Sequence, residues 1–212
     1  MRLDALDVGR LVTRGLRLLG DEGAGGAAVL VPLVFSRDDG GWDVVLEVRA
    51  ATLDVQPGEV CLPGGAGKPG ETPRETAVRE TAEELLVDPG RVHVLASLGT
   101  LPGPTPRPLH AFVGTIDGYD GSFSTDEVAS TFRVPLAWLL SHEPRRERVA
   151  LRRSFGPDFP WELIPGGRSY PWGAREDCIP FYETDPVIWG ATARVLDRLA
   201  RALARGVDER AV

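Results

Sequence analysis

The chain has 212 residues, which is enough to bury a sizeable core within one domain. Its hydrophobic content of 42% and charged content of 26% are ordinary for a soluble globular protein. The net charge of −7 argues against a surface for nucleic acid or for an anionic membrane. Two cysteines, Cys61 and Cys178, are too few for a disulfide framework and match no metal-ligand spacing.

The N-terminal part of the chain predicts a helix followed by a hairpin. Residues 1–23 place leucines among Asp and Arg, which favours an N-terminal helical extension rather than a signal peptide, so we expect a cytoplasmic protein. Residues 27–35 are rich in valine and leucine and predict a buried strand. Residues 42–49 return as a second strand after a turn at residues 37–41, and residues 50–61 form a loop or short strand.

The C-terminal part predicts further strands and two helices. The expected strands are residues 92–98, 111–116 and 147–155. Residues 101–108 are too rich in proline for regular pairing, and residues 156–176 are irregular. Short helical structure is expected at residues 138–140 and a closing helix at 186–205, with Trp189 in the core. We therefore predict one domain, residues 1–212, with a mixed sheet flanked by helices.

A glycine-rich loop running into an acidic helix, residues 65–87, interrupts this pattern of strands. Thr72 is a suitable N-cap, Pro73 fits the first helical position and Glu75 completes a capping box. The helical pattern runs to Asp88-Pro89-Gly90, where proline prevents continuation.

Helical spacing of about 100° per residue gives this segment two faces. Three carboxylates share one face: Glu80, Glu83 and Glu84. The opposite face is apolar and is expected to pack on the core: Val78, Ala82 and Leu85. Arg79 lies one turn from both Glu75 and Glu83, so it is placed to bridge to either.

Such a carboxylate cluster is either a solvated helix face, which is usual for Glu-rich helices, or a cation site. Neighbouring carboxylates repel one another, and Mg²⁺ or Mn²⁺ relieves this because both ions prefer oxygen ligands. The preceding loop, residues 62–65, favours the cation site because its glycines let the backbone approach a metal or a phosphate closely. A P-loop is excluded, since Leu62 takes the place of its first glycine and Pro69 follows Lys68.

The positions of these residues resemble the Nudix box of the Nudix hydrolases. The matching residues are Gly65, Glu71, Arg79, Glu80, Glu83 and Glu84. Thr81 replaces the usual aliphatic residue and Leu86 the usual glycine, and we expect Asp88-Pro89-Gly90 to supply the helix stop instead. The resemblance implies an α/β fold of the Nudix type, an α/β/α sandwich with a mixed β-sheet. It also implies an enzyme that hydrolyses nucleoside diphosphate derivatives with Mg²⁺ or Mn²⁺.

The same resemblance implies a role for each residue. Glu80 and Glu84 would be the main metal ligands, with Glu83 a further ligand or base, and a backbone carbonyl of Gly64 or Gly65 is a candidate ligand. Glu127, on a later loop, is a second candidate base or ligand. Glu71 and Arg79 would be structural.

A second resemblance, to the coenzyme A diphosphatases within the Nudix superfamily, covers the segment before the box. The matching residues are Arg49, Ala50, Gly58 and Pro63-Gly64-Gly65, while Glu47 replaces threonine, Asp54 replaces a second arginine and Leu62 replaces phenylalanine. Segments 127–128, 134–136 and 188–193 are also similar. The resemblance implies hydrolysis of coenzyme A or its thioesters to adenosine 3′,5′-bisphosphate and 4′-phosphopantetheine. Arg49, Gly64 and Gly65 become candidates for substrate binding, with a plain salt bridge the alternative for Arg49.

Two other functions remain open at this point. The substrate of a Nudix enzyme is alternatively ADP-ribose, a dinucleotide or a nucleoside triphosphate, and the loss of an arginine at Asp54 favours that choice. A non-catalytic ligand-sensing Nudix domain is the third hypothesis. The expected partner is a small-molecule nucleotide, with no nucleic acid and no membrane, and a homodimer is one of the open oligomeric states.

Overall fold

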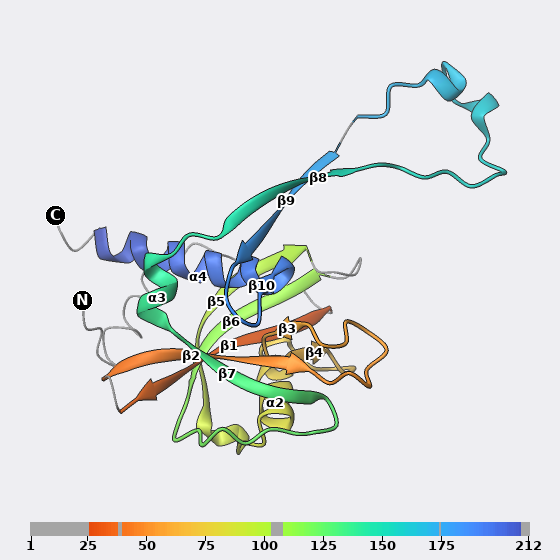
Figure 1. Cartoon of the computed structure of the whole chain (residues 1–212). Helices are drawn as coiled ribbons and strands as arrows, with labels where there is room; N and C mark the ends of the chain where they lie inside the picture. Colours follow the sequence, from red (N-terminus) through yellow and green to blue (C-terminus); the bar gives the residue numbers. More distant parts are fainter. Residues whose placement is uncertain (1–25, 38–39, 103–107, 174, 209–212) are drawn as a thin grey trace.

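A mixed β-sheet forms the centre of the chain in a computed structural model that describes residues 26–37, 40–102, 108–173 and 175–208 (Figure 1). Its strands are β1 (Ala27–Ser36), β2 (Gly41–Arg49), β3 (Val60–Cys61), β4 (Gly64–Ala66), β5 (Val92–Pro102), β6 (Pro108–Ile116) and β7 (Val128–Pro135). The order is β3-β2-β1-β6-β5, with β4 also pairing β1 and β7 also pairing β2. Strands β1 and β6 are parallel, whereas β1 and β2 are antiparallel, so the sheet is mixed as expected.

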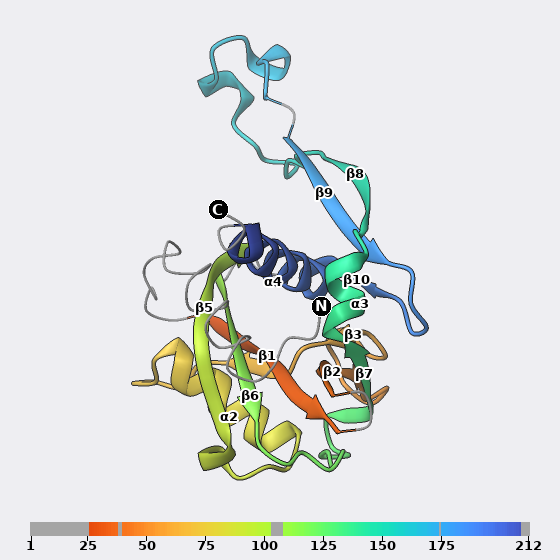
Figure 2. The ribbon, with the colours of Figure 1, turned by 90° about the vertical axis from the view of Figure 1, so that its left-hand side faces the viewer.

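Helices cover both faces of this sheet (Figure 2). Helix α2 (Pro73–Glu84) lies on one face, and α3 (Leu136–Ser141) and α4 (Gly190–Asp208) lie on the other. Strand β2 shows why two cores form. Successive side chains of this strand point to opposite faces, so Val45 lies on the α2 side and Val44 and Leu46 lie on the α4 side. All three are fully buried. The predicted α/β/α sandwich is confirmed.

Several local predictions are confirmed. Strands β1 and β2 form the expected hairpin, with Ser36 opposite Gly41, although residues 38 and 39 lie outside the described part of the chain. The short helix expected at residues 138–140 is α3.

The predicted N-terminal extension, residues 1–23, lies outside the described residues, and the single-domain assignment of residues 1–212 stays a prediction. No helix among the described residues is long and apolar enough to cross a membrane.

The proline-rich connection differs from the prediction. Strands β5 and β6 pair as far as Leu101 with Leu109 and Pro102 with Pro108, so the hairpin extends into the segment we expected to be unpaired. β5 is the last strand in the sheet order, and a proline at the end of an edge strand removes no essential ladder hydrogen bond.

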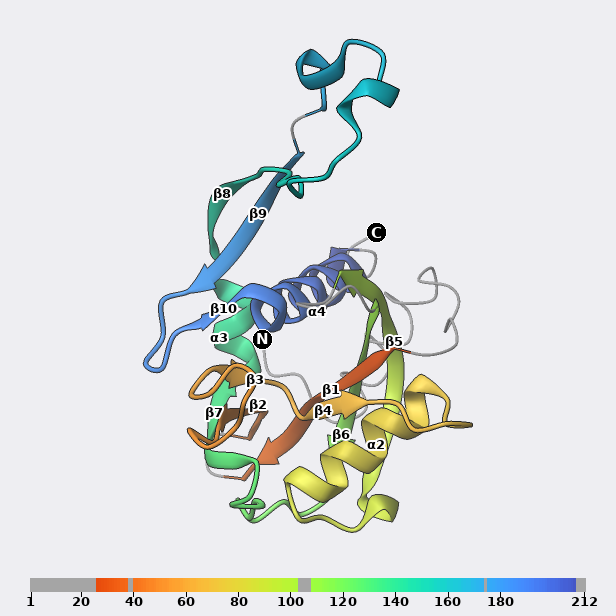
Figure 3. The same ribbon diagram turned by 90° about the vertical axis from the view of Figure 1, so that its right-hand side faces the viewer.

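A second sheet forms an arm beyond the sandwich. Strands β8 (Arg145–Leu151), β9 (Arg175–Tyr182) and β10 (Ile188–Trp189) are antiparallel neighbours in the order β10-β9-β8. β8 and β9 project away from the body and carry residues 152–173 at their far end (Figure 3). Those residues form two 3₁₀ turns, η2 (Trp161–Leu163) and η3 (Gly167–Ser169), within the region predicted to be irregular.

Two predicted boundaries were wrong in this region. The strand expected at residues 147–155 ends at Leu151, and the closing helix begins at Gly190 rather than at residue 186. Ile188 and Trp189 pair with Tyr182 and Phe181 of the preceding strand, so strand pairing overrides the helical spacing that continues through them.

The end of α2 shows another difference. We expected Asp88-Pro89-Gly90 to stop the helix, but α2 ends at Glu84, and Pro89–Arg91 forms the separate 3₁₀ turn η1. Leu86 has a φ of +49°, in the left-handed region, at the position where the Nudix box has glycine. The chain therefore makes the turn that glycine normally makes, but with a residue whose Cβ opposes it.

We predict that Leu86→Gly stabilises the protein by about 0.5–1 kcal/mol. A non-glycine residue in the left-handed region costs roughly 1–2 kcal/mol, and the greater freedom of glycine in the unfolded chain offsets about 0.4–1 kcal/mol of this gain. Leu86 is already largely exposed, so little apolar burial is lost. Urea unfolding measures the change. Leu86→Ala keeps a Cβ and is the control, and equal stability of the Gly and Ala variants would contradict the account.

Candidate active site

The start of α2 has the predicted capping box. The Thr72 hydroxyl accepts a hydrogen bond from the Glu75 amide at 3.2 Å, and the Glu75 carboxylate accepts one from the Thr72 amide at 2.8 Å. Hydrogen bonds from Thr72 lower the pKa of Glu75. Glu75 serves the cap, and the ion pairs that Arg79 makes among the described residues are with Glu71, Glu80 and Glu83 rather than with Glu75.

Arg79 instead joins the glycine loop to the helix. Its Nε and Nη2 donate to the two carboxylate oxygens of Glu71 at 2.6 and 3.0 Å, and Nη2 also donates to the Ala66 carbonyl at 3.2 Å. The hydrogen bond from Arg79 is the main reason that the pKa of Glu71 falls to about 2. Two residues expected to be structural therefore form a bidentate pair that holds the loop against the helix.

The same guanidinium also contacts two of the three clustered carboxylates. Arg79 Nη1 lies 2.8 Å from Glu80 Oε1 and 3.0 Å from Glu83 Oε2. The side chain of Glu83 is 54% exposed and also lies 3.6 Å from Lys68 Nζ. Glu80 is more enclosed, and burial raises its pKa although Arg79 acts to lower it.

Glu84 has a different environment from the other two glutamates. It is only 4% exposed, and its Oε2 accepts a hydrogen bond from the Gly64 amide at 2.8 Å. Burial raises the pKa of Glu84 to about 8, opposed by the Gly64 hydrogen bond and reinforced by the negative charges of Glu80 and Glu127. Glu84 is thus a buried carboxyl group surrounded by other acids, which disfavours its charged form in the absence of a cation.

Glycine is required at both loop positions that face this helix. A Cβ on Gly65 would lie 2.6 Å from the carboxyl group of Glu80, and a Cβ on Gly64 would lie 2.3 Å from the Ala28 carbonyl oxygen. β4 pairs with β1 in this region, which fixes the loop in position. The backbone at Gly64 and Gly65 therefore lies in direct contact with the acidic side of α2.

Glu127 lies near the same carboxylates although it is distant in sequence. Its carbonyl accepts a hydrogen bond from the Ala50 amide at 2.9 Å, just before β7, and its charge raises the pKa of both Glu80 and Glu84. The charge of Glu127 thus acts on both Glu80 and Glu84, while Glu83 lies at the exposed edge.

The donor set suits a hard divalent cation. All of these side chains offer oxygen ligands, and their mutual repulsion is the condition that Mg²⁺ or Mn²⁺ relieves. Within the described residues no three His, Cys, Asp or Glu side chains are already gathered closely enough to hold a metal ion. An ion at this place would therefore compete with Arg79 for the carboxylates of Glu80 and Glu83.

A cavity of about 400 Å³ adjoins the glycine loop. It is bounded by Gly64 and Gly65 on one side and by the first turn of α4 on the other, with Arg49 and Trp189 in its wall. Arg49 lies at the end of β2 and donates from Nε to the Val55 carbonyl at 3.2 Å, so its described hydrogen bond is to a backbone carbonyl rather than to the carboxylate of a salt bridge.

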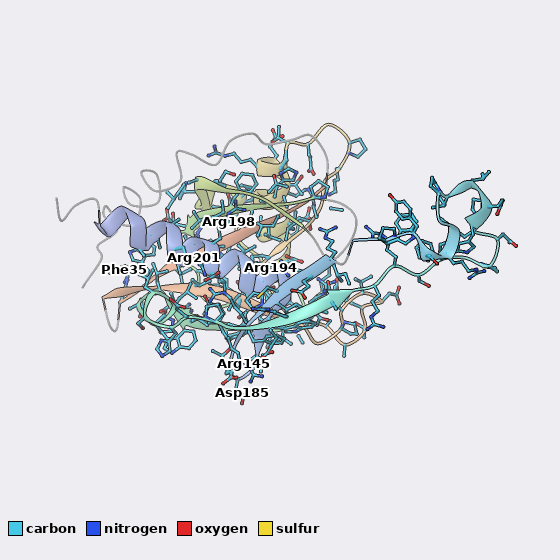
Figure 4. The ribbon with its side chains drawn as sticks, turned by 90° about the horizontal axis from the view of Figure 1, so that it is seen from above. Phe35, Arg145, Asp185, Arg194, Arg198 and Arg201 are labelled. Carbon is cyan, nitrogen blue, oxygen red and sulfur yellow. The ribbon has the colours of Figure 1, made fainter. Side chains whose placement is uncertain are left out.

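Sequence reasoning missed some of the residues in this cavity and misplaced one. Trp189 was expected in the core but is 39% exposed and lies parallel to Phe181, with ring centroids 6.0 Å apart. Arg194 lies on α4 beside β9 (Figure 4). It pairs with Asp177 at 2.8 Å, and both residues line the cavity. No local signal in the sequence predicts the pair of Arg194 and Asp177. Asp177 lies on β9 of the arm and Arg194 on α4, so the two meet only when the arm packs beside that helix.

Glu47 is the other residue whose importance we did not predict. It appeared only as a departure from the threonine of the coenzyme A diphosphatase pattern, yet it is 1% exposed in the centre of the sheet. The available signal was a lone charged residue within the apolar strand Val44 to Val48.

Comparison with protein families matches residues 26–153 to the NUDIX domain. The match covers more than half of the chain and includes the glycine loop, α2 and Glu127. The chain belongs to the Nudix family.

Three curated relatives illustrate this membership. Nudix hydrolase 22, chloroplastic, of Arabidopsis thaliana is 31% identical over 82% of this chain and 54% of its own length. Nudix hydrolase 3 of Caenorhabditis elegans is 38% identical over 58% of this chain and 53% of its own length. An uncharacterized Nudix hydrolase, NudL, of Yersinia enterocolitica is 30% identical over 82% of this chain and 80% of its own length. The chain thus spans about half the length of the first two relatives.

We predict that Glu71→Gln weakens the loss of stability in acid. The pKa of Glu71 is lower in the folded protein than in the unfolded chain, so its stabilising contribution is present above about pH 4.5 and is lost as the pH falls towards about 2. The variant lacks this titration and should show a shallower fall in the free energy of unfolding across that range, measured by urea unfolding. Glu176→Gln, at an exposed position on the arm, is the control. An unchanged slope for Glu71→Gln would contradict the pairing with Arg79.

Proposed function

We propose that this protein hydrolyses a pyrophosphate bond in a nucleoside diphosphate derivative with the help of Mg²⁺ or Mn²⁺. The observation that carries the proposal is the position of Glu84, a buried carboxyl group bonded to the glycine loop and close to Glu80 and Glu127. Membership of the Nudix family supports the reaction class.

Different residues are proposed to bind the cation and to accept the proton. Glu80 and Glu84 would hold the cation, and a carbonyl of Gly64 or Gly65 is available beside them. When bound, the cation supplies neutralising charge for the diphosphate and lowers the pKa of a water molecule. Glu83 and Glu127 are the candidates to accept the proton of the attacking water, and Glu83 has the exposed position that exchange with solvent requires. Glu71 and Arg79 hold the loop and helix in register.

The cavity supports a substrate with a group extending beyond the diphosphate. It begins at Gly64 and Gly65, where the phosphates would lie, and continues to the first turn of α4. Arg49 faces it and offers a guanidinium to a phosphate, while Trp189 offers an aromatic surface. We propose coenzyme A or its thioesters as the substrate, on the similarity of Arg49, Ala50, Gly58 and Pro63-Gly64-Gly65 to the coenzyme A diphosphatases. The cytoplasmic location is proposed with it.

A different nucleoside diphosphate derivative, such as ADP-ribose or a dinucleotide, is the alternative. Asp54 favours it, because an acidic residue lies in the exposed loop where the coenzyme A pattern has an arginine. Turnover of coenzyme A compared with that of ADP-ribose and NADH separates the two substrates. A non-catalytic sensing domain is disfavoured, since every carboxylate of the box is present.

We predict that Glu84→Gln lowers the rate of diphosphate hydrolysis by at least about 100-fold. A bound cation contributes several kcal/mol of charge stabilisation, and each 1.36 kcal/mol corresponds to a factor of about ten in rate. Because the amide still accepts the hydrogen bond from Gly64, the fold should be retained, which circular dichroism checks. The assay measures phosphate-containing products with Mg²⁺ and with Mn²⁺. Activity equal to that of the wild type would refute the role of Glu84.

A further inference from the structure

Glu47 lies beneath the acidic helix, on the face of the sheet that α2 covers. Side chains two residues apart on a strand point to the same face. Val45 is packed in the cluster that contains Ala77 and Leu85 of the α2 region, and Glu47 follows Val45 by two residues on β2. In the neighbouring strands, Glu47 is opposite Cys61 on β3 and Thr131 on β7.

The carboxyl group of Glu47 is buried and only partly satisfied. The residue is 1% exposed, and its Oε1 is one of the few buried side-chain oxygens without a hydrogen-bond partner in the described part of the chain. Its Oε2 receives only the thiol of Cys61, with sulfur and oxygen 3.8 Å apart, which is a weak contact. Burying a carboxyl oxygen without a partner is costly, so a ligand that contacts Oε1 would recover free energy.

Glu47 is also close to the residues proposed to hold the cation. Burial is the main cause that raises the pKa of Glu47, and the negative charge of Glu84 is the second. Glu127 acts in the same direction and Arg49 in the opposite one. The carboxyl group of Glu47 therefore lies near the acidic side chains of Glu84 and Glu127. Glu47 is on the last part of β2, two residues before Arg49.

We propose that Glu47 supplies a further carboxylate oxygen to the divalent-cation site formed by Glu80 and Glu84. This inference rests on the proposed function. The threonine of the coenzyme A diphosphatase pattern cannot carry a charge at this position, whereas Glu47 adds a carboxyl group on which the charge of Glu84 acts. The extra carboxylate would strengthen cation binding before any diphosphate arrives.

The competing explanation is that Glu47 is a protonated core residue whose only role is packing against Cys61. It predicts that removing the carboxylate changes stability but leaves cation affinity unchanged. A measurement of cation binding without substrate therefore separates the two explanations, because it does not depend on turnover.

The experiment is a titration with Mn²⁺, in which electron paramagnetic resonance reports the free ion. We expect Glu47→Gln to weaken Mn²⁺ binding by at least about tenfold, as loss of groups that support a metal site commonly does. Mn²⁺ should also raise the melting temperature of the variant less than that of the wild type. Asp43→Asn is the matched control. Asp43 is the other buried carboxylate of β2, about 13 Å along the strand from Glu47, and its loss should leave the affinity unchanged.

The outcomes are distinguishable from failure of the proposed function. If the wild type binds Mn²⁺ and Glu47→Gln binds it equally well, the role of Glu47 is overturned while the proposed function stands. If the wild type binds no Mn²⁺ and hydrolyses no diphosphate, both proposals fail. If Glu47→Gln does not fold, Glu47→Thr carries the test with the same expected loss of affinity, and unchanged affinity in that variant overturns the proposal.

Discussion

The hydrogen bond from the Gly64 amide to the carboxyl group of Glu84, 2.8 Å long, joins the last turn of α2 to the glycine loop. It requires a buried acid, because Glu84 is nearly inaccessible to solvent, and a close backbone approach, because Gly64 lies against β1. One amide donor offsets only part of the cost of burying a charged carboxylate, which is why the pKa of Glu84 stays high. The last turn of the helix therefore holds an acid whose charge is poorly compensated within the described part of the chain.

The other half of the motif is partly neutralised by Arg79. Arg79 binds Glu71 through two hydrogen bonds and also contacts Glu80 and Glu83, so one guanidinium offsets part of the negative charge of three carboxylates. The Glu71–Arg79 pair holds the loop to the helix, while Glu84 is a buried acid bonded to Gly64, which lines the cavity.

The central part of the site was predictable because its determinants are local. The capping box, the glycine loop and the helical spacing of Glu80, Glu83 and Glu84 all lie within about 20 residues, and the fold class followed from the same resemblance. What remained hidden depends on strand pairing, burial and backbone conformation that helical spacing does not encode. The strand identity of Ile188–Trp189 comes from pairing with β9, and the exposure of Trp189 follows from that pairing. The burial of Glu47 was missed although its apolar neighbours on the strand were a signal, since a charged residue is rarely fully buried. The left-handed turn at Leu86 was missed because leucine rarely adopts it.

The most direct test of the account is anomalous diffraction from crystals of the protein grown with Mn²⁺. The account predicts an anomalous peak in contact with the carboxylates of Glu80 and Glu84, beside the backbone of Gly64 and Gly65. Data in which Mn²⁺ binds elsewhere, with Glu84 still bonded only to the Gly64 amide, would contradict it.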